Sequence, residues 1–166
     1  EVYTRQPCLA TGLVSDPAGA NGCDIRTDPD TGDRNLGLYR MQVYDGQSTG
    51  MHWQLQKVAA RHGRRYYETG ERMPVAIFLG GDPVFTFCAT APLPDGLDEF
   101  LLAGYLRRKS VELVKCETND LEVPASADIV IEGYVDPTEP LRDEGPFGHH
   151  TGYYTQPQPY PLLHIT

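Results

Sequence analysis

The sequence has no apolar run that approaches the roughly 20 residues of a membrane-spanning helix. Its first residues also lack the charged and then apolar layout of a signal peptide. Basic charge is scarce, since 14 Lys and Arg face 23 Asp and Glu and the formal net charge is −9. Clustered basic side chains bind phosphate backbones, so we expect no nucleic-acid partner. The densest basic runs, residues 61–65 and 107–109, are short and are interpreted as solvated helix faces, with a polyanion site as the alternative.

Cysteine is scarce as well, and the four cysteines have no CxxC spacing, which gives no support to a zinc or dithiol motif. Cys88 and Cys116 lie in apolar runs and are most simply buried thiols. A pairing of Cys8 with Cys23 is left open by the sequence. We expect reduced thiols and a cytoplasmic protein. The chain begins at Glu1 rather than Met, which fits an excised domain or a lost leader.

Common catalytic motifs are absent: the sequence has no Walker loop, GxGxxG, HExxH, zinc-ribbon spacing or GxSxG. What is present is 166 residues of ordinary composition, 40% hydrophobic and 22% charged, enough for one domain with a real core. The counts of 17 Gly and 14 Pro are somewhat high. They favour a turn-rich sheet protein over a helical bundle.

Hydrophobic periodicity predicts more strands than helices. The predicted strands are residues 38–44, 51–55, 74–79, 84–90, 111–116, 127–135 and 162–166. Helices are predicted over residues 56–62, where Gly63 ends the spacing, and over 96–108, with Asp95 as N-cap. Residues 1–34 are expected to be mainly irregular, with one short strand among them. The expected fold class is α+β, built on an antiparallel sheet or barrel.

The segment 144–154, EGPFGHHTGYY, combines one carboxylate, two imidazoles and three aromatics with three glycines and a proline. Titratable groups on such a loop are typical of a reaction site. A loop can turn Glu144 and His149 toward one cavity, whereas a straight strand would place them on opposite faces. His149 and His150 are neighbours and are expected to point in different directions. A solvent-exposed hairpin loop with polar side chains is the alternative.

Three further segments carry polar side chains that suit a binding site, each with a plainer structural explanation. Gly37 allows a ligand to approach the backbone and Arg40 offers a planar fork for a carboxylate or phosphate, but strand arginines are more often surface residues. Alternation places His52 and Gln56 on one face, which equally suits a half-buried strand with a polar outer side. Glu99 in the first turn of the second helix is favourable to the helix dipole without any function.

Six segments, in this order along the chain, resemble the central domain of the UbiD-type decarboxylases. They are NLGLYRMQ (35–42), TGMHWQ (49–54), LGGDP (79–83), CETNDLEVPASA (116–127), IVIEG (129–133) and the segment EGPFGHHTGYY (144–154). The resemblance divides the chain into an irregular N-terminal segment, residues 1–30, and a central flavin-binding domain, residues 31–166. It implies an antiparallel split β-barrel similar to flavin reductases and FMN-binding domains, with two or three helices.

The resemblance also implies a cofactor, prenylated FMN, whose phosphate is held through Mn²⁺ with K⁺ nearby. The metal ligands of the family are an Asn, a His and a Glu, which match Asn35, Gln56 and Glu99. Gln56 departs from the histidine of the family, although a glutamine oxygen can bind a hard cation. The residues implied in cofactor binding are Gly37, Leu38, Tyr39, Arg40, Gln56, Thr90 and Pro92.

The catalytic network of the family is an Arg, a Glu and a second acid, which match Arg40, Glu144 and His149. His149 departs from the usual Asp or Glu, but an imidazole with a reference pKa of about 6.5 can also pass a proton. The resemblance implies that Arg40 orients the substrate carboxylate and that Glu144 holds Arg40. His149 would then protonate the carbon that loses carbon dioxide, with the flavin as electron sink.

The implied activity is that of a carboxy-lyase, the reversible non-oxidative decarboxylation of an aromatic or α,β-unsaturated carboxylic acid. Family members have a further N-terminal segment and a C-terminal α/β domain, so this chain is expected to be the cofactor-binding central domain and to be inactive if isolated. The implied partners are a small carboxylic acid, a flavin prenyltransferase that supplies the cofactor, and further copies in a homo-oligomer formed through the C-terminal domain. The alternative is a non-catalytic flavin-binding or assembly subunit, which the departures at Gln56 and His149 favour.

Overall fold

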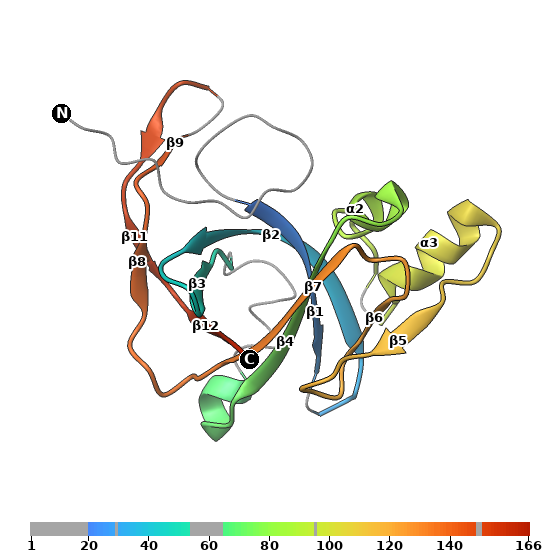
Figure 1. The fold of residues 1–166 in the computed structure, drawn as a ribbon, viewed down its shortest axis with the longest axis horizontal. Helices are drawn as coiled ribbons and strands as arrows, with labels where there is room; N and C mark the ends of the chain where they lie inside the picture. The colour runs from blue at the N-terminus through green and yellow to red at the C-terminus, as the bar shows by residue number, and fades with distance from the viewer. Residues whose placement is uncertain (1–19, 29, 54–64, 95, 149–150) are drawn as a thin grey trace.

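The computed structural model describes residues 20–28, 30–53, 65–94, 96–148 and 151–166. Six antiparallel strands close into a barrel in the order β1-β2-β3-β12-β7-β4 (Figure 1). Their bounds are β1 Ala20–Thr27, β2 Arg34–Val43, β3 Ser48–Met51, β4 Met73–Leu79, β7 Ile129–Val135 and β12 Leu162–Ile165. The predicted fold class, α+β around an antiparallel barrel, is confirmed. None of the described helices is long and apolar enough to cross a membrane.

Strand β1 lies in the N-terminal segment that composition marks as mainly irregular. It pairs with β2 from Ala20 opposite Met41 to Thr27 opposite Arg34, and also with β4. Hydrophobic alternation is hidden in this strand because its inward positions include Asp24, which accepts a hydrogen bond from the buried indole of Trp53 at 3.0 Å. A strand with charged residues on its core face has no clear apolar period.

The barrel interior encloses an ion pair between Asp24 and Arg26, which are 1% and 0% exposed. Arg26 Nε donates to Asp24 Oδ1 at 3.1 Å, and the guanidinium lies 4.3 Å from the centroid of the Trp53 ring. A buried charge is stable only when it is paired and hydrogen-bonded. These three side chains therefore depend on one another.

The strand predicted over residues 84–90 is wrong, because residues Pro83–Cys88 form helix α2. Asp82 caps this helix by accepting a hydrogen bond from the Val84 N–H at 3.0 Å. Pro83 then occupies the first turn, where its fixed φ suits a helix and its missing N–H is not needed. The apolar run alone does not distinguish a short buried strand from a short helix, and the cap decides it here.

The helix predicted over residues 96–108 is confirmed as α3, Glu99–Arg107. Its N-cap is Asp98, which accepts from the Phe100 N–H at 2.7 Å, and the expected N-cap Asp95 lies outside the described residues. The helix predicted over 56–62 also lies outside them, whereas residues 65–69 are helical. The strand predicted over residues 51–55 is misplaced, since β3 ends at Met51 and residues 54–55 are not described.

Three short ribbons complete the fold. Their strands are β5 Leu113–Lys115 with β6 Glu122–Pro124, β8 Arg142–Glu144 with β11 Gln158–Tyr160, and β9 Phe147–Gly148 with β10 Tyr154–Thr155. The helices α2 and α3 lie on the same side of the barrel as β5 and β6, and β8, β9 and β11 lie on the opposite side (Figure 1). Strand β2 contributes side chains to both sides.

The apolar core has two parts. One fills the barrel and includes Tyr39, Met41 and Met51, and the other packs α2 and α3 against the outer face of β1, β2 and β4. Cys23, Cys88 and Cys116 are buried free thiols, as predicted for Cys88 and Cys116. Burial raises the pKa of Cys23 and of Cys116 to about 11, so both thiols stay protonated at neutral pH.

Candidate functional site

A buried carboxylate, Glu144 at the end of β8, faces Arg40 in the middle of β2. Arg40 donates two hydrogen bonds to it, from Nε to Oε1 at 2.8 Å and from Nη2 to Oε2 at 3.1 Å. The Glu144 side chain is 2% exposed and the Arg40 side chain is 18% exposed. A bidentate pair of this kind fixes the guanidinium plane as well as its position.

Hydrogen bonds hold the backbone around Glu144 to Gln42 in β2 and to Tyr44, which directly follows β2. The Gly145 N–H donates to Gln42 Oε1 at 2.7 Å, and the Tyr44 hydroxyl donates to the Asp143 carbonyl at 3.0 Å. Gly145 has a φ of 108°, a region that side chains rarely adopt. The glycine after Glu144 is therefore a conformational requirement of this site.

The imidazole of His52 and the aromatic rings of Tyr160 and Phe147 surround the ion pair. His52 Nδ1 lies 2.6 Å from Glu144 Oε2, and the His52 ring lies 4.3 Å from the ring of Tyr160 in β11. The Arg40 guanidinium lies 3.7 Å from the centroid of the Phe147 ring. The segment expected to be a loop thus has Glu144 at the end of β8 and Phe147 in β9, and it supplies both a carboxylate and an aromatic face to Arg40.

Burial raises the pKa of Glu144, but hydrogen bonds from His52 and Arg40 and the positive charge of Arg40 outweigh it, so the pKa lies below its usual value. An opposite charge and donated hydrogen bonds both favour the ionised form. Glu144 therefore remains a carboxylate at neutral pH. It acts here as a permanent acceptor for Arg40 rather than as a proton donor.

The lowered pKa of Glu144 gives a testable pH dependence of stability. Its ionised form contributes stability that is fully present above the unfolded-state pKa of about 4.3 and is lost as pH falls through the folded-state pKa. We expect the unfolding free energy of the wild type to fall more steeply below pH 5 than that of Glu144→Gln. Urea unfolding at a series of pH values measures both curves, and parallel curves would contradict the expectation.

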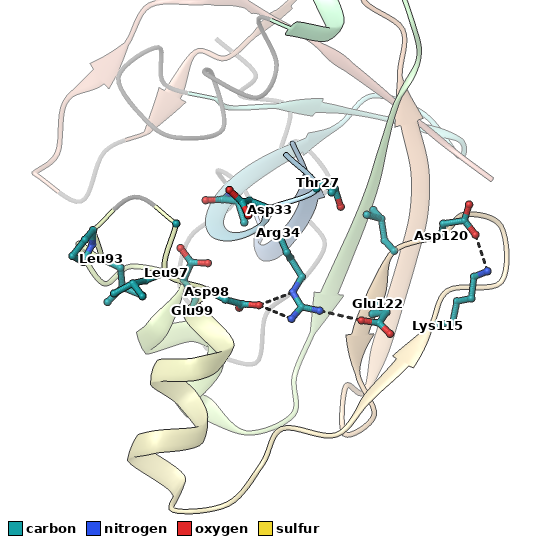
Figure 2. Close-up of a pocket in the computed structure, with 15 residues that line it drawn as sticks. Thr27, Asp33, Arg34, Leu93, Leu97, Asp98, Glu99, Lys115, Asp120 and Glu122 are labelled. Carbon is teal, nitrogen blue, oxygen red and sulfur yellow. Dashed lines mark hydrogen bonds and ion pairs between the residues drawn. The ribbon is translucent and has the colours of Figure 1, made fainter. Parts of the chain in front are cut away.

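A cavity of about 630 Å³ lies where β2 begins, between the first turn of α3 and the β5–β6 ribbon. Figure 2 shows Arg34 reaching across it, with Asp98 and Glu122 at either side of the guanidinium. The Arg34 Nε–Asp98 Oδ2 and Nη1–Glu122 Oε2 distances are 3.0 and 3.1 Å. Among the described residues, five carboxylates and two basic side chains line the cavity, so its electrostatic character is acidic.

Asn35 and Glu99, two of the three residues expected to hold a metal ion, both line this cavity. The Asn35 amide nitrogen is buried and has no hydrogen-bond partner among the described residues. Glu99 Oε2 accepts from the Leu36 N–H at 3.0 Å, and burial raises the pKa of the Glu99 carboxyl above its usual value. A buried amide N–H group without an acceptor costs free energy, so the Asn35 nitrogen suits an external hydrogen-bond acceptor in the cavity.

The other residues expected at a cofactor differ in their surroundings. A Cβ added to Gly37 would lie 2.3 Å from the ring of Tyr39, so the ring of Tyr39 takes up the space at this glycine. Tyr39 is buried and Leu38 packs against the outer core. Thr90 donates its hydroxyl to the Phe87 carbonyl at 2.8 Å. Thr90 and Pro92 do not line the cavity, which begins at the neighbouring Leu93.

The structure thus arranges the expected site residues in two groups, Arg40 with Glu144 and Asn35 with Glu99. Gln56 and His149 lie outside the described residues. Within the described ranges, no three His, Cys, Asp or Glu side chains gather as a metal site. The contact of His52 with Glu144 was not predicted. Alternation marked His52 as polar-facing, but nothing in the sequence indicates its distance to a residue 92 positions away.

Comparison with known proteins is consistent over nearly the whole chain. The profile of the UbiD family, described as 3-octaprenyl-4-hydroxybenzoate carboxy-lyase, Rift-related domain, matches residues 20–166. An uncharacterized protein of Archaeoglobus fulgidus is 54% identical over 143 residues, which are 86% of this chain and 30% of that protein. One of Aquifex aeolicus is 51% identical over 142 residues, 86% of this chain and 29% of that protein. The chain spans about a third of the length of these relatives.

Solved structures with the same fold include UbiD-class enzymes. HmfF of Pelotomaculum thermopropionicum, in complex with FMN, matches with a TM-score of 0.83 and 35% identity. The match covers 90% of this chain and 34% of the HmfF chain. Vanillic acid decarboxylase of Sedimentibacter hydroxybenzoicus, in its closed form, has a TM-score of 0.82 at 28% identity, over 89% and 32% of the two chains. The profile match and the shared barrel show that this chain belongs to the UbiD family.

Proposed function

We propose that this chain is the cofactor-binding domain of an enzyme that decarboxylates an aromatic or α,β-unsaturated carboxylic acid without oxidation. The observation that carries the proposal is the buried bidentate pair of Arg40 with Glu144. UbiD-class structures similar to this chain contain FMN or prenylated FMN, and others are named as decarboxylases of vanillic and 3,4-dihydroxybenzoic acid. The proposed cofactor is prenylated FMN, supplied by a flavin prenyltransferase.

Arg40 has the geometry to orient a substrate carboxylate. Glu144 occupies its Nε and Nη2, and Nη1 has no hydrogen-bond partner among the described residues. A guanidinium held in this way presents a fixed donor to an incoming anion. When bound, prenylated FMN supplies the electron sink for the carbon that loses carbon dioxide. His149 is proposed to protonate that carbon, as its position in the segment EGPFGHHTGYY suggests.

The acidic cavity is suited to bind the cofactor phosphate through bridging cations rather than directly. A phosphate group would be repelled by the five carboxylates there unless a metal ion lay between them. Asn35 and Glu99 offer oxygen ligands of the kind that hard divalent cations prefer. We propose that they hold Mn²⁺ together with Gln56, with K⁺ nearby. We also propose that the full-length gene product forms a homo-oligomer.

Flavin content tests the proposal directly. The product of the gene is made in a host that co-expresses a flavin prenyltransferase, purified without oxygen in the presence of Mn²⁺, and examined by absorbance and flavin mass. We expect stoichiometric prenylated FMN in the wild type and at least about tenfold lower occupancy in Glu99→Gln, because even the loss of a side chain that only supports a metal ligand typically lowers metal affinity 10–100-fold. Glu112→Gln, which alters an exposed glutamate whose ion-pair partner among the described residues is Lys109, is the matched control.

The outcomes separate the two candidate functions. Flavin binding with turnover of unsaturated acids supports the decarboxylase. Flavin binding without turnover supports a non-catalytic flavin-binding subunit, which the unusual Gln56 and His149 favour. Absence of flavin from the wild-type gene product would contradict both.

A further inference from the structure

We infer that His52 is a positioning residue for the proposed decarboxylation, one that fixes the orientation and charge of Glu144 and through it the plane of Arg40. The inference rests on the proposed function. It assigns a role to a residue that the catalytic network expected from the sequence, Arg40, Glu144 and His149, does not include.

The backbone holds His52 beside Arg40. The His52 N–H donates to the Arg40 carbonyl at 3.2 Å, just beyond the pairing of Met41 with Met51 between β2 and β3. Arg40 in β2 and His52 directly after β3 therefore both reach the Glu144 carboxylate at the end of β8. Their relative placement is set by the main chain and not by flexible side chains.

The three donors leave Glu144 little freedom to rotate. Arg40 Nε binds Oε1 at 2.8 Å, while Arg40 Nη2 and His52 Nδ1 both bind Oε2, at 3.1 and 2.6 Å. Without His52, Oε2 would keep only the longer of its two bonds. A carboxylate that is 2% exposed cannot recover a lost donor from solvent, and an incompletely satisfied buried charge is costly.

The contact also decides where the proton of the His52 ring lies. An ionised carboxylate only accepts hydrogen bonds, so Nδ1 must carry a proton. In the neutral ring, Nε2 is then an acceptor, and it has no partner among the described residues. Tyr160 supports this orientation by packing its ring 4.3 Å from the His52 ring at an interplanar angle of 48°. A carboxylate that orients a histidine ring is a common device in catalytic sites, and here the two groups orient each other.

The chain contains a matched control pair. His164 Nε2 lies 2.7 Å from Glu139 Oε2, and its ring stacks on Tyr134 at 5.1 Å. This second histidine also combines a glutamate partner with a tyrosine ring, and none of its hydrogen bonds or ring contacts among the described residues involves Arg40 or Glu144. His164→Phe therefore makes the same chemical change as His52→Phe without touching the proposed site.

Titration of Glu144 followed by ¹³C NMR of the side-chain carboxyl tests the inference in the unliganded gene product, with Glu144→Gln to assign the resonance. His52→Phe keeps a ring against Tyr160 and removes the donor. His52→Asn places an amide donor near the position of Nδ1. We expect His52→Phe to raise the titration midpoint of Glu144 and to broaden the Arg40 Nε–H resonance, and we expect His52→Asn to restore both. His164→Phe is expected to leave both unchanged.

Turnover supplies the second readout, with the gene product loaded with prenylated FMN. We expect His52→Phe to lower kcat by roughly 10- to 100-fold, the size of effect produced by a small misplacement of a reacting group, and His52→Asn to recover most of it. If His52→Phe does not fold, His52→Gln replaces it, because its amide lies one methylene beyond the position of Nδ1.

An unchanged Glu144 midpoint and Arg40 resonance in the His52 variant would overturn the inference, whatever the activity. A raised midpoint with rescue by asparagine supports it, and the NMR measurement needs no cofactor. A wild-type protein that binds no flavin or turns over no acid would instead overturn the proposed function. The two failures are therefore distinguishable.

Discussion

Replacing Arg40 with alanine will lower kcat/KM for decarboxylation by about 10³-fold, within the 10²–10⁴ range that single positioned catalytic groups contribute. The substitution removes the only arginine that the described structure bonds to Glu144 and the Nη1 donor proposed for the substrate carboxylate. His52 still binds Glu144 Oε2 at 2.6 Å, so the buried carboxylate keeps one donor and the fold should survive. Steady-state kinetics of the flavin-loaded gene product measure the loss.

Arg72→Ala is the control for Arg40→Ala. Arg72 Nε also bonds a carboxylate, Asp136 Oδ2 at 3.2 Å, and its guanidinium lies 4.4 Å from the Tyr134 ring. Arg72 therefore lies over an aromatic ring as Arg40 lies over the Phe147 ring, but the Arg72 side chain is 63% exposed. We expect wild-type kcat/KM in Arg72→Ala and at least a tenfold loss in Arg40→Lys, which keeps the charge but not the fork. A kcat/KM for Arg40→Ala within threefold of the Arg72→Ala value would refute the assigned role.

Replacing Arg26 with methionine will destabilise the barrel by about 3–5 kcal/mol, the usual cost of removing one partner from a buried ion pair. Arg26 is 0% exposed, and among the described residues Asp24 would keep only the Trp53 indole as a side-chain donor, at 3.0 Å. The Trp53 ring also loses its contact with the guanidinium of Arg26. Such a loss is a large fraction of the roughly 5–15 kcal/mol that stabilises a domain. Urea unfolding at pH 7 gives the change in unfolding free energy.

Two further variants separate the buried charge from the lost packing. Arg65→Met removes an arginine from an exposed cluster with Asp30 and Glu68, and we expect a nearly unchanged stability because exposed pairs contribute little. Arg26→Met combined with Asp24→Asn removes both charges and should recover more than half of the loss. A double variant less stable than Arg26→Met would show that lost packing, and not the unpaired carboxylate, dominates.

The secondary structure was predictable where one physical signal was sufficient. The apolar run Met73–Leu79 is β4, and helical spacing located α3. Prediction was wrong over Pro83–Cys88, where an aspartate cap and a proline convert an apolar run into a helix. It was incomplete in β1, because this strand turns charged residues inward. Both failures arise where side-chain partners, and not hydrophobic period, decide the local conformation.

The site was predictable in its members and not in its connections. The segments NLGLYR and EGPFG indicated Arg40 and Glu144 as candidates, but spacing alone cannot show that residues 104 positions apart form a bidentate pair at 2.8 and 3.1 Å. His52 carried only the weak signal of a polar face. Its distance of 2.6 Å to Glu144 follows from the way β8 packs beside β2 and β3.

The sequence by itself determined the fold class, the family resemblance and the residue types available for chemistry, because alternation, turn residues and ordered motifs are local properties of the chain. Tertiary structure decided which of those residues meet. Closure of the barrel buries Asp24 and Arg26 together, and the packing of β8 beside β2 and β3 brings the Glu144 carboxylate to Arg40 and His52. The strength of these contacts depends on burial, since exclusion of water makes a charge costly when alone and firmly held when paired.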